Sequence, residues 1–204
     1  YSYRENMGET ENKGYEAYLN FRAFDHKASK SYVNIFASVA RNKNKITKIS
    51  NSLKKFNEDQ DADKNQADNA ANKSDITTPS VRFEEGQSMS AIWAVPSLGI
   101  DPQNGKEIFV KKDGSVTYQW NAGDQVVCRD TQPEFTGNFG FNSEIKGFGI
   151  SATFSYRLGG QIYNSTLVDK VENASIYYNV DRRVFTDRWQ KPGDVALYKS
   201  IADK

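Results

Sequence analysis

Apolar and polar residues alternate most regularly along residues 133–160. In the first half, one parity carries Phe135, Phe139, Phe141 and Ile145, and the other carries Thr136, Asn138, Asn142 and Glu144. After Lys146-Gly147, one parity is apolar again, with Phe148, Ile150, Ala152, Phe154, Tyr156 and Leu158. Because the side chains of a strand alternate between its faces, the pattern predicts strands at about 134–145 and 148–158, each with one apolar face.

The length of these strands bears on the solvent that the apolar face meets. A strand that crosses a bilayer needs about 9–11 residues, whereas strands of soluble domains most often have about 5–6. Both predicted strands have the greater length. The alternation alone fits a membrane barrel and a soluble sandwich equally.

The rest of the chain adds strands, short turns and long excursions. Strands at about 14–24 and 31–42 are predicted to form a first hairpin. Two further strands are predicted at about 88–95 and 106–120. Within the last of these, Asp113-Gly114 is a dipeptide typical of a type I′ turn. Apolar residues at 46–56 have helical spacing, whereas 57–78 is almost free of large apolar groups and is predicted to be a mobile loop. Residues 160–204 are predicted to form a long external loop.

Short turns therefore alternate with long connecting segments along the chain. A barrel with short turns at one end and long external loops at the other gives this order. The fold class predicted is all-β, an antiparallel meander that forms part of a large transmembrane β-barrel.

Composition narrows the function classes. The 204 residues carry a net charge of +1, which gives no reason to expect nucleic acid as a partner. The single cysteine, Cys128, excludes an internal disulfide. The aromatic content of 13% suits residues at a membrane interface or a sugar-binding surface.

Several stretches, spread in order over nearly the whole chain, carry a family resemblance. They are Asn12-Lys13-Gly14-Tyr15-Glu16, Asn42-Lys43-Asn44-Lys45-Ile46, Glu85-Gly86-Gln87-Ser88, Gly99-Ile100-Asp101-Pro102, Gly105-Lys106-Glu107, Asp130-Thr131-Gln132-Pro133, Tyr156 to Asn164, and Arg188 to Asp194. In these stretches the sequence resembles the SusC/RagA family of TonB-linked (TonB-dependent) outer-membrane transporters.

The resemblance implies a barrel of about 22 strands with a plugged lumen in the bacterial outer membrane. It also implies a SusD-like surface lipoprotein as partner, import of oligosaccharides or peptides, and energy from the TonB complex. The N-terminal plug, with its TonB-contacting segment, and the last barrel strands have no counterpart here. We therefore expect an internal piece of the C-terminal half of such a barrel, in contact with outer-membrane lipid.

Catalytic, cofactor and metal sites are not expected. Asp59, Asp61 and Asp63 have the odd spacing of a calcium loop, but Lys64 and Ala70 stand where glycine and glutamate belong. His26 is the only histidine and lies in a predicted tight turn, so we expect neither a His-based catalytic dyad nor a metal site with several histidines. The spacing of the carboxylates favours no glycosidase pair.

Aromatic residues outside the long strands are the candidates for contact with substrate or partner. They are Trp93, Tyr118, Trp120, Tyr163, Tyr177, Tyr178 and Trp189. Flat rings with a polar handle suit sugar stacking or a protein interface. The alternative for each is that it anchors the protein at the membrane interface or packs one loop against another.

The function predicted is therefore part of a nutrient importer, without enzymatic activity. The alternative is a soluble all-β glycan-binding or surface interaction module that uses the same aromatics. In that case the apolar faces of the two long hairpins would pack against one another.

Overall fold

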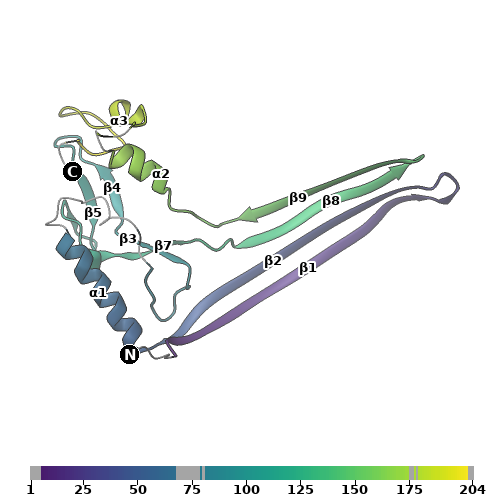
Figure 1. The fold of residues 1–204 in the computed structure, drawn as a ribbon, viewed down its shortest axis with the longest axis horizontal. Helices are drawn as coiled ribbons and strands as arrows, with labels where there is room; N and C mark the ends of the chain where they lie inside the picture. Colours follow the sequence, from purple (N-terminus) through teal and green to yellow (C-terminus); the bar gives the residue numbers. More distant parts are fainter. Residues whose placement is uncertain (1–5, 68–78, 80, 175–176, 178, 202–204) are drawn as a thin grey trace.

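A long four-stranded antiparallel sheet dominates the structure, in the order β1-β2-β8-β9. The computed structural model describes residues 6–67, 79, 81–174, 177 and 179–201. The strands of the sheet are β1 (Gly8–His26), β2 (Ser31–Ile49), β8 (Phe135–Ile145) and β9 (Phe148–Leu158). Figure 1 shows the sheet projecting as an arm from a body that contains the other elements. The predicted antiparallel all-β arrangement is confirmed.

Strands β1 and β2 are longer than the alternation predicted. The predicted range 14–24 lies within β1, and 31–42 lies within β2. The additional residues pair with one another in register, for example Asn12 with Asn44. Their polar side chains give no period of two in hydrophobicity, which is why the sequence pattern did not reveal them.

A β-bulge in β1 changes one predicted face. Arg22 pairs with Asn34, but Phe24 pairs with Val33, so Ala23 is the additional residue. A residue added to one strand reverses the parity that follows it. Phe24 therefore takes the place on the apolar face that strict alternation gave to Ala23.

The two hairpin turns at the tip of the arm differ in type. Lys146 and Gly147 both have positive φ, at 52° and 87°, and they join the paired residues Ile145 and Phe148. Positive φ at both central residues defines the type I′ turn that tight hairpins prefer. The first hairpin instead closes through the 3-10 turn η1 (Lys27–Ser29), where His26 Nδ1 accepts a hydrogen bond from the Ser29 backbone N–H at 3.3 Å.

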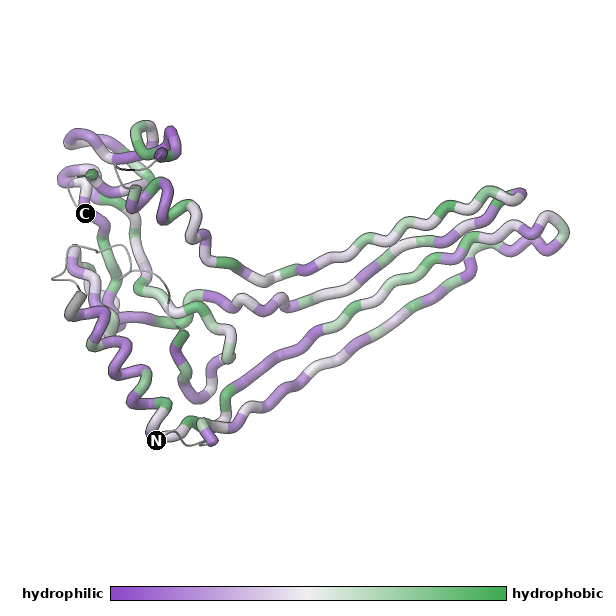
Figure 2. Tube along the Cα trace, in the orientation of Figure 1, coloured by the Kyte–Doolittle hydropathy of each residue, from purple (hydrophilic) through white to green (hydrophobic). Residues whose placement is uncertain are grey.

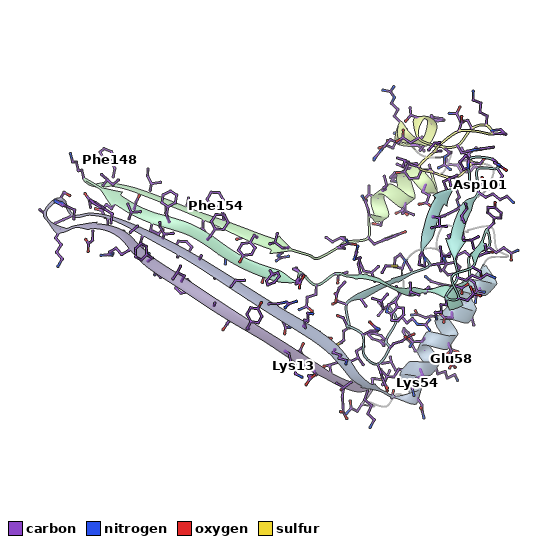
Figure 3. The ribbon with its side chains drawn as sticks, turned by 180° about the vertical axis from the view of Figure 1, so that it is seen from behind. Lys13, Lys54, Glu58, Asp101, Phe148 and Phe154 are labelled. Atoms are coloured by element: carbon purple, nitrogen blue, oxygen red, sulfur yellow. The ribbon has the colours of Figure 1, made fainter. Side chains whose placement is uncertain are left out.

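One face of the arm is apolar and exposed. Paired residues place Leu19, Ala37, Phe139 and Phe154 in one row across the four strands. Phe139 remains 49% exposed and Phe154 54% exposed, so neither is enclosed between two stacked sheets. Figure 2 shows hydrophobic and hydrophilic residues following one another along these strands, and Figure 3 shows the side chains of Phe148 and Phe154 standing away from the sheet.

A close contact reinforces the pairing of β2 with β8. The Tyr156 hydroxyl donates to the Ser38 carbonyl at 2.8 Å, so the side chain crosses β8 over Gly137. A Cβ at Gly137 would lie 2.5 Å from the Tyr156 hydroxyl oxygen and 2.0 Å from the Ser38 carbonyl oxygen. Only glycine permits this approach, in which an aromatic ring covers the bare backbone of a neighbouring strand.

We call the rest of the described chain the head (residues 50–134 and 159–201). Its elements are α1 (Asn51–Ala67), β3 (Ala91–Ala94), β4 (Ser97–Ile100), β5 (Glu107–Val110), β6 (Val116–Thr117), η3 (Ala122–Asp124), β7 (Val126–Asp130), α2 (Ser165–Leu167), η4 (Val168–Glu172) and α3 (Arg183–Thr186). Strand β3 pairs with β7, and β4, β5 and β6 form a second small sheet. A small core of Val171, Ala174 and Val184 lies in the C-terminal part.

The head differs from the sequence prediction in several places. Strand β7 was not predicted, and β3 is shorter than the predicted strand 88–95. Residues 57–67, predicted as a mobile loop, continue helix α1, and the remainder of that loop, 68–78, lies outside the described residues. The predicted strand 106–120 is two short strands, β5 and β6. The predicted external loop 160–204 contains the helical segments α2, η4 and α3.

The turn between β5 and β6 is not the predicted type I′. Gly114 has φ of +83°, but Asp113 is not among the residues with positive φ. Gly114 N–H donates to the Lys111 carbonyl at 2.9 Å, and Lys111 N–H donates to the Ser115 carbonyl at 2.9 Å. This is a three-residue hairpin loop, in which a type I turn precedes a left-handed glycine.

Candidate functional site

The candidate aromatics lie in the head, and the structure gives them different roles. Tyr178 lies outside the described residues. Trp93, on β3, is only 3% exposed, and the guanidinium of Arg82 lies 5.5 Å from the centre of its ring. Arg82 also donates to Asp61 at 2.5 Å and to Glu84 at 2.9 Å. Trp93 and Arg82 therefore join α1 to β3, and the burial of Trp93 argues against direct contact with a ligand.

Tyr118 and Trp189 both bind the turn at 101–105. The Tyr118 hydroxyl donates to Asp101 Oδ2 at 2.6 Å, and this bond, with the backbone N–H of Gln103, lowers the pKa of the Asp101 carboxyl. The Trp189 indole N–H donates to the Pro102 carbonyl at 2.9 Å. A Cβ on Gly105 would lie 2.5 Å from the Trp189 ring, so the ring packs flat against this glycine. Two predicted candidates thus meet at one turn, where both have structural partners.

Trp120 borders a polar cavity of about 590 Å³ between the end of α1 and the hairpin of β5 and β6. The other residues that line it are Asn65, Lys111, Thr117, Gln119, Asn121, Gly123 and Asp124. The ammonium of Lys64 lies 5.9 Å from the centre of the Trp120 ring, and burial lowers the pKa of this lysine. An aromatic face beside amides and a carboxylate has the chemistry of a site for a polar, hydroxyl-rich or amide-rich ligand.

Tyr163 and Tyr177 belong to the C-terminal part of the head. Tyr163 is half-buried and directly precedes the cap of α2, where Asn164 accepts from the Leu167 N–H at 3.0 Å. Tyr177 is 86% exposed. Tyr118, Trp120 and Tyr177 are thus the candidates with ring surface open to a ligand or partner.

A cavity on the polar face of the arm is a further candidate site, and it contains none of the predicted aromatic residues. A cavity of about 720 Å³ is lined there by Glu16, Tyr18, Ser38, Thr136, Asn138, Ser155 and Arg157, among others. Ser155 donates to Asn138 Oδ1 at 2.7 Å, and Ser151 donates to the Asn142 side chain. The alternating polar parity of β8 and β9 was the signal for this surface.

A third cavity, of about 500 Å³, lies where the base of the first hairpin meets α1, and its lining is mostly apolar. It is bordered by Met7, Ile46, Ile49, Leu53, Phe56, Phe83 and Met89, among others. The helical segment predicted at 46–56 was wrong for Ile46 and Ile49, which belong to β2, and right for Leu53 and Phe56, which lie on α1. The cavity itself depends on residues from three distant parts of the chain.

Among the residues that the structure describes, no group of three or more His, Cys, Asp or Glu side chains is placed to hold a metal ion. Asp61, one of the predicted acidic trio, is instead bound to Arg82. In the described part of the chain, no helix has both the length and the apolar character needed to cross a membrane.

Comparisons with known proteins agree with this geometry. No family model matches the chain. It is 26% identical over 180 residues to TonB-dependent receptor P3 of Formosa agariphila, a match that covers 81% of this chain and 16% of that protein. It is 29% identical over 101 residues to TonB-dependent receptor P39 of the same organism, covering 48% of this chain and 9% of that protein.

Solved structures show the same fold. The RagAB peptide transporter superposes with a TM-score of 0.69 at 21% identity, and the match covers 96% of this chain and 20% of that chain. The RagAB peptide importer in a closed-closed state gives a TM-score of 0.67 at 20% identity, with the same coverage. The fold is therefore that of part of a transporter barrel.

These findings confirm the predicted resemblance to SusC/RagA-type TonB-dependent transporters and the predicted outer-membrane location. The chain spans less than a fifth of the curated relatives that it matches.

Proposed function

We propose that this chain is part of the wall and outer surface of an outer-membrane, TonB-dependent nutrient importer. The single observation that carries the proposal is the uncovered apolar face of the four-stranded sheet. Exposed rows of phenylalanine and leucine are costly in water but favourable against lipid acyl chains. Strands β8 and β9, with 11 residues each, have the length that a tilted strand needs to cross the hydrocarbon.

In this proposal the polar face of the arm lines an interior passage, and the head lies outside the membrane. The short turns at the tip of the arm are then on the periplasmic side, as barrels of this kind have them. Polar side chains that bond to one another across strands, as Ser155 does to Asn138, keep the passage hydrophilic without leaving their polar groups unpaired.

The cargo that we propose is an oligosaccharide or a peptide, imported together with a SusD-like surface lipoprotein and with energy from the TonB complex. The relative whose fold matches is named a peptide transporter, which supports the second cargo class. Tyr118, Trp120 and Tyr177 are the proposed contacts for cargo or lipoprotein, because their rings are at least partly exposed on the head. Trp93 and Trp189 support the head from within.

Membrane fractionation of the full-length parent protein tests this proposal. We expect recovery in the outer-membrane fraction, in a form whose electrophoretic mobility changes on heating, as folded barrels show. A soluble glycan-binding module, the alternative, would be recovered in the aqueous fraction, and that result would end the importer proposal.

Uptake measurements test the cargo. Deletion of the parent gene is expected to abolish growth on one class of oligosaccharide or peptide, with a loss of cell-associated labelled cargo. Substitution of Trp120 with alanine should weaken uptake, whereas Phe185→Ala removes an exposed aromatic from α3, outside the polar cavity, and should not. Equal uptake by the Trp120 variant and the native protein would show that Trp120 does not contact the cargo.

A further inference from the structure

Three lysines gather on one side of the arm, at the end close to the head. We call Lys13, Lys43 and Lys45 the lysine cluster. Lys13 pairs directly with Lys43, and Lys45 pairs with Glu11. Figure 3 shows Lys13 near the end of β1 where the arm meets the head, far from Phe148 at the tip.

The register places the lysine cluster on the apolar side of the sheet. Residues two apart on a strand share a face, so Lys13 follows Tyr15 and Leu19 on β1. In the same way Lys43 and Lys45 follow Val39 on β2. The lysines therefore continue the rows that face lipid, and the polar passage lies on the opposite face.

The charges of the cluster are not balanced within the sheet. Glu11 forms an ion pair with Lys13 at 2.8 Å, and the Lys13 side chain is 77% exposed. This carboxylate is the only acid in the paired positions that hold the three lysines. Like charges directly opposite one another on neighbouring strands are destabilising. Glu11 offsets one of the three positive charges, and an anion beside the pair of Lys13 and Lys43 would relieve the repulsion that remains.

The height of the cluster matches the lipid headgroups. The last aromatic row before it contains Tyr15, which is paired with Arg41, and the Arg41 guanidinium lies 5.2 Å from the centre of the Phe135 ring. A rise of about 3.3 Å per residue and a tilt of about 40° place Lys13 about 5 Å, and Lys45 about 10 Å, beyond that row. The headgroup layer extends about 5–8 Å beyond the hydrocarbon, so Lys13 and Lys43 lie within it, and Lys45 lies just beyond it, from where its long side chain reaches back to the layer.

We propose that the lysine cluster binds the phosphate groups of anionic lipid in the outer leaflet. This inference rests on the proposed function, because it requires the apolar face to contact lipid. Lysine ammonium groups bind phosphate as point charges, and each basic residue near an anionic surface strengthens binding. An acidic protein partner is less favoured, since the cluster continues the lipid-facing rows instead of belonging to the head or the passage.

The test uses the full-length parent protein reconstituted in nanodiscs of phosphatidylcholine. One set also contains lipid A with both phosphates, and the other contains the same lipid with its phosphates removed. Lipid retained on the protein is measured by native mass spectrometry. The native protein should prefer the phosphorylated lipid, and replacing all three lysines of the cluster with glutamine should reduce that preference by about fivefold per lysine.

A matched variant controls for net charge. Lys54→Gln, Lys55→Gln and Lys112→Gln remove the same charge from exposed positions of the head, and this variant should keep the native preference. Arginine in place of the three cluster lysines should also keep it, which separates loss of charge from loss of fold. Equal loss in the head variant would overturn the inference, as would an unchanged preference in the glutamine variant.

The outcome is separable from the fate of the proposed function. If every variant remains in the outer membrane as a heat-modifiable barrel but none distinguishes the two lipids, the lysine cluster has no lipid site and the importer proposal stands. If the cluster variant keeps its lipid but no longer co-purifies with an acidic envelope protein, the surface serves a protein and the inference is wrong. Recovery of the native protein in the aqueous fraction would remove both proposals.

Discussion

The arm and the head place their apolar residues in opposite ways. On the arm, phenylalanine and leucine are on the surface, and the side chain of Ser31, at the start of β2, is buried. In the head, Trp93, Phe109, Val171 and Val184 are buried, and the apolar side chains that stay exposed, such as Val195, do not form rows along paired strands. Exposed apolar rows are unfavourable in water and favourable against lipid, so we infer that the arm and the head contact different media. The proposed contact of the arm with lipid accounts for this difference, which the average composition does not show.

The largest effect is expected where this contrast is strongest, at the middle of β9. Phe154 is exposed on the apolar face, and its neighbour Thr153 is exposed on the polar face. A charged residue on the lipid side of a barrel costs about 2–4 kcal/mol near the bilayer midplane. Phe154→Arg should therefore lower the free energy of unfolding of the full-length barrel by about this amount, measured by urea titration in lipid vesicles.

Thr153→Arg is the matched control for this change. Its side chain enters the polar passage, where the charge is hydrated, so the variant should unfold at nearly the native urea concentration. Equal destabilisation by the two substitutions would mean that both faces meet the same medium, and the contrast between arm and head would lose its explanation.

Arg188 gives the second largest effect, in the head. It is 6% exposed and donates to the carbonyls of Lys199 at 2.9 Å, Glu172 at 2.7 Å and Val171. Methionine would fill the space but leave these carbonyls without a donor, at a cost of about 2–3 kcal/mol. Arg188→Met should make the C-terminal part of the head sensitive to protease added to intact cells, while the barrel remains heat-modifiable.

Arg183 offers a control five residues earlier. Its ion pair with Asp181 at 2.9 Å lies in solvent, where such pairs contribute little to stability. Arg183→Met should therefore leave protease resistance close to native. If Arg188→Met also destabilised the barrel in urea, head and arm would not be independent in stability.

The sequence predicted the structure best where local features determine it, as in the hairpin of β8 and β9. Strands β8 and β9 begin and end within one residue of the predicted ranges, because alternation and the Lys146-Gly147 turn are both local. Helix α1 was missed beyond Phe56, because its residues are polar on all sides. It is supported by contacts from distant residues: Asn57 donates to the Phe83 carbonyl at 2.7 Å, and Asp61 accepts from Arg82.

The candidate site was harder to predict, because it too depends on contacts between residues that are distant in the sequence. The aromatic residues could be listed from the sequence, but their exposure depends on which distant group covers each ring. Arg82 covers Trp93, and the glycine at 105 receives Trp189. Neither contact has a signature in the sequence around the tryptophan. The polar face of the arm depends only on which residues alternate, so the sequence of β8 and β9 was enough to predict it.

The smallest effect concerns a buried carboxyl in the head. Burial raises the pKa of Glu107, and the nearby Glu172 adds to this, although a hydrogen bond from Ser97 and the charge of Lys199 oppose it. The folded head therefore holds this proton more tightly than the unfolded chain does. Its stabilising contribution is complete below the ordinary carboxyl pKa and is lost as pH rises through the raised value.

Glu107→Gln should consequently make the head more resistant to protease at neutral pH, by roughly 1 kcal/mol or less, with no gain at acidic pH. Asp113 supplies a control of opposite sign, since the Ser115 hydroxyl and N–H lower the pKa of its exposed carboxyl. The stability that Asp113 adds is present above the ordinary carboxyl pKa and is lost as pH falls, so Asp113→Asn should weaken the head only at neutral pH. A gain for Glu107→Gln that is the same at both pH values would show that packing, and not the buried charge, sets the difference.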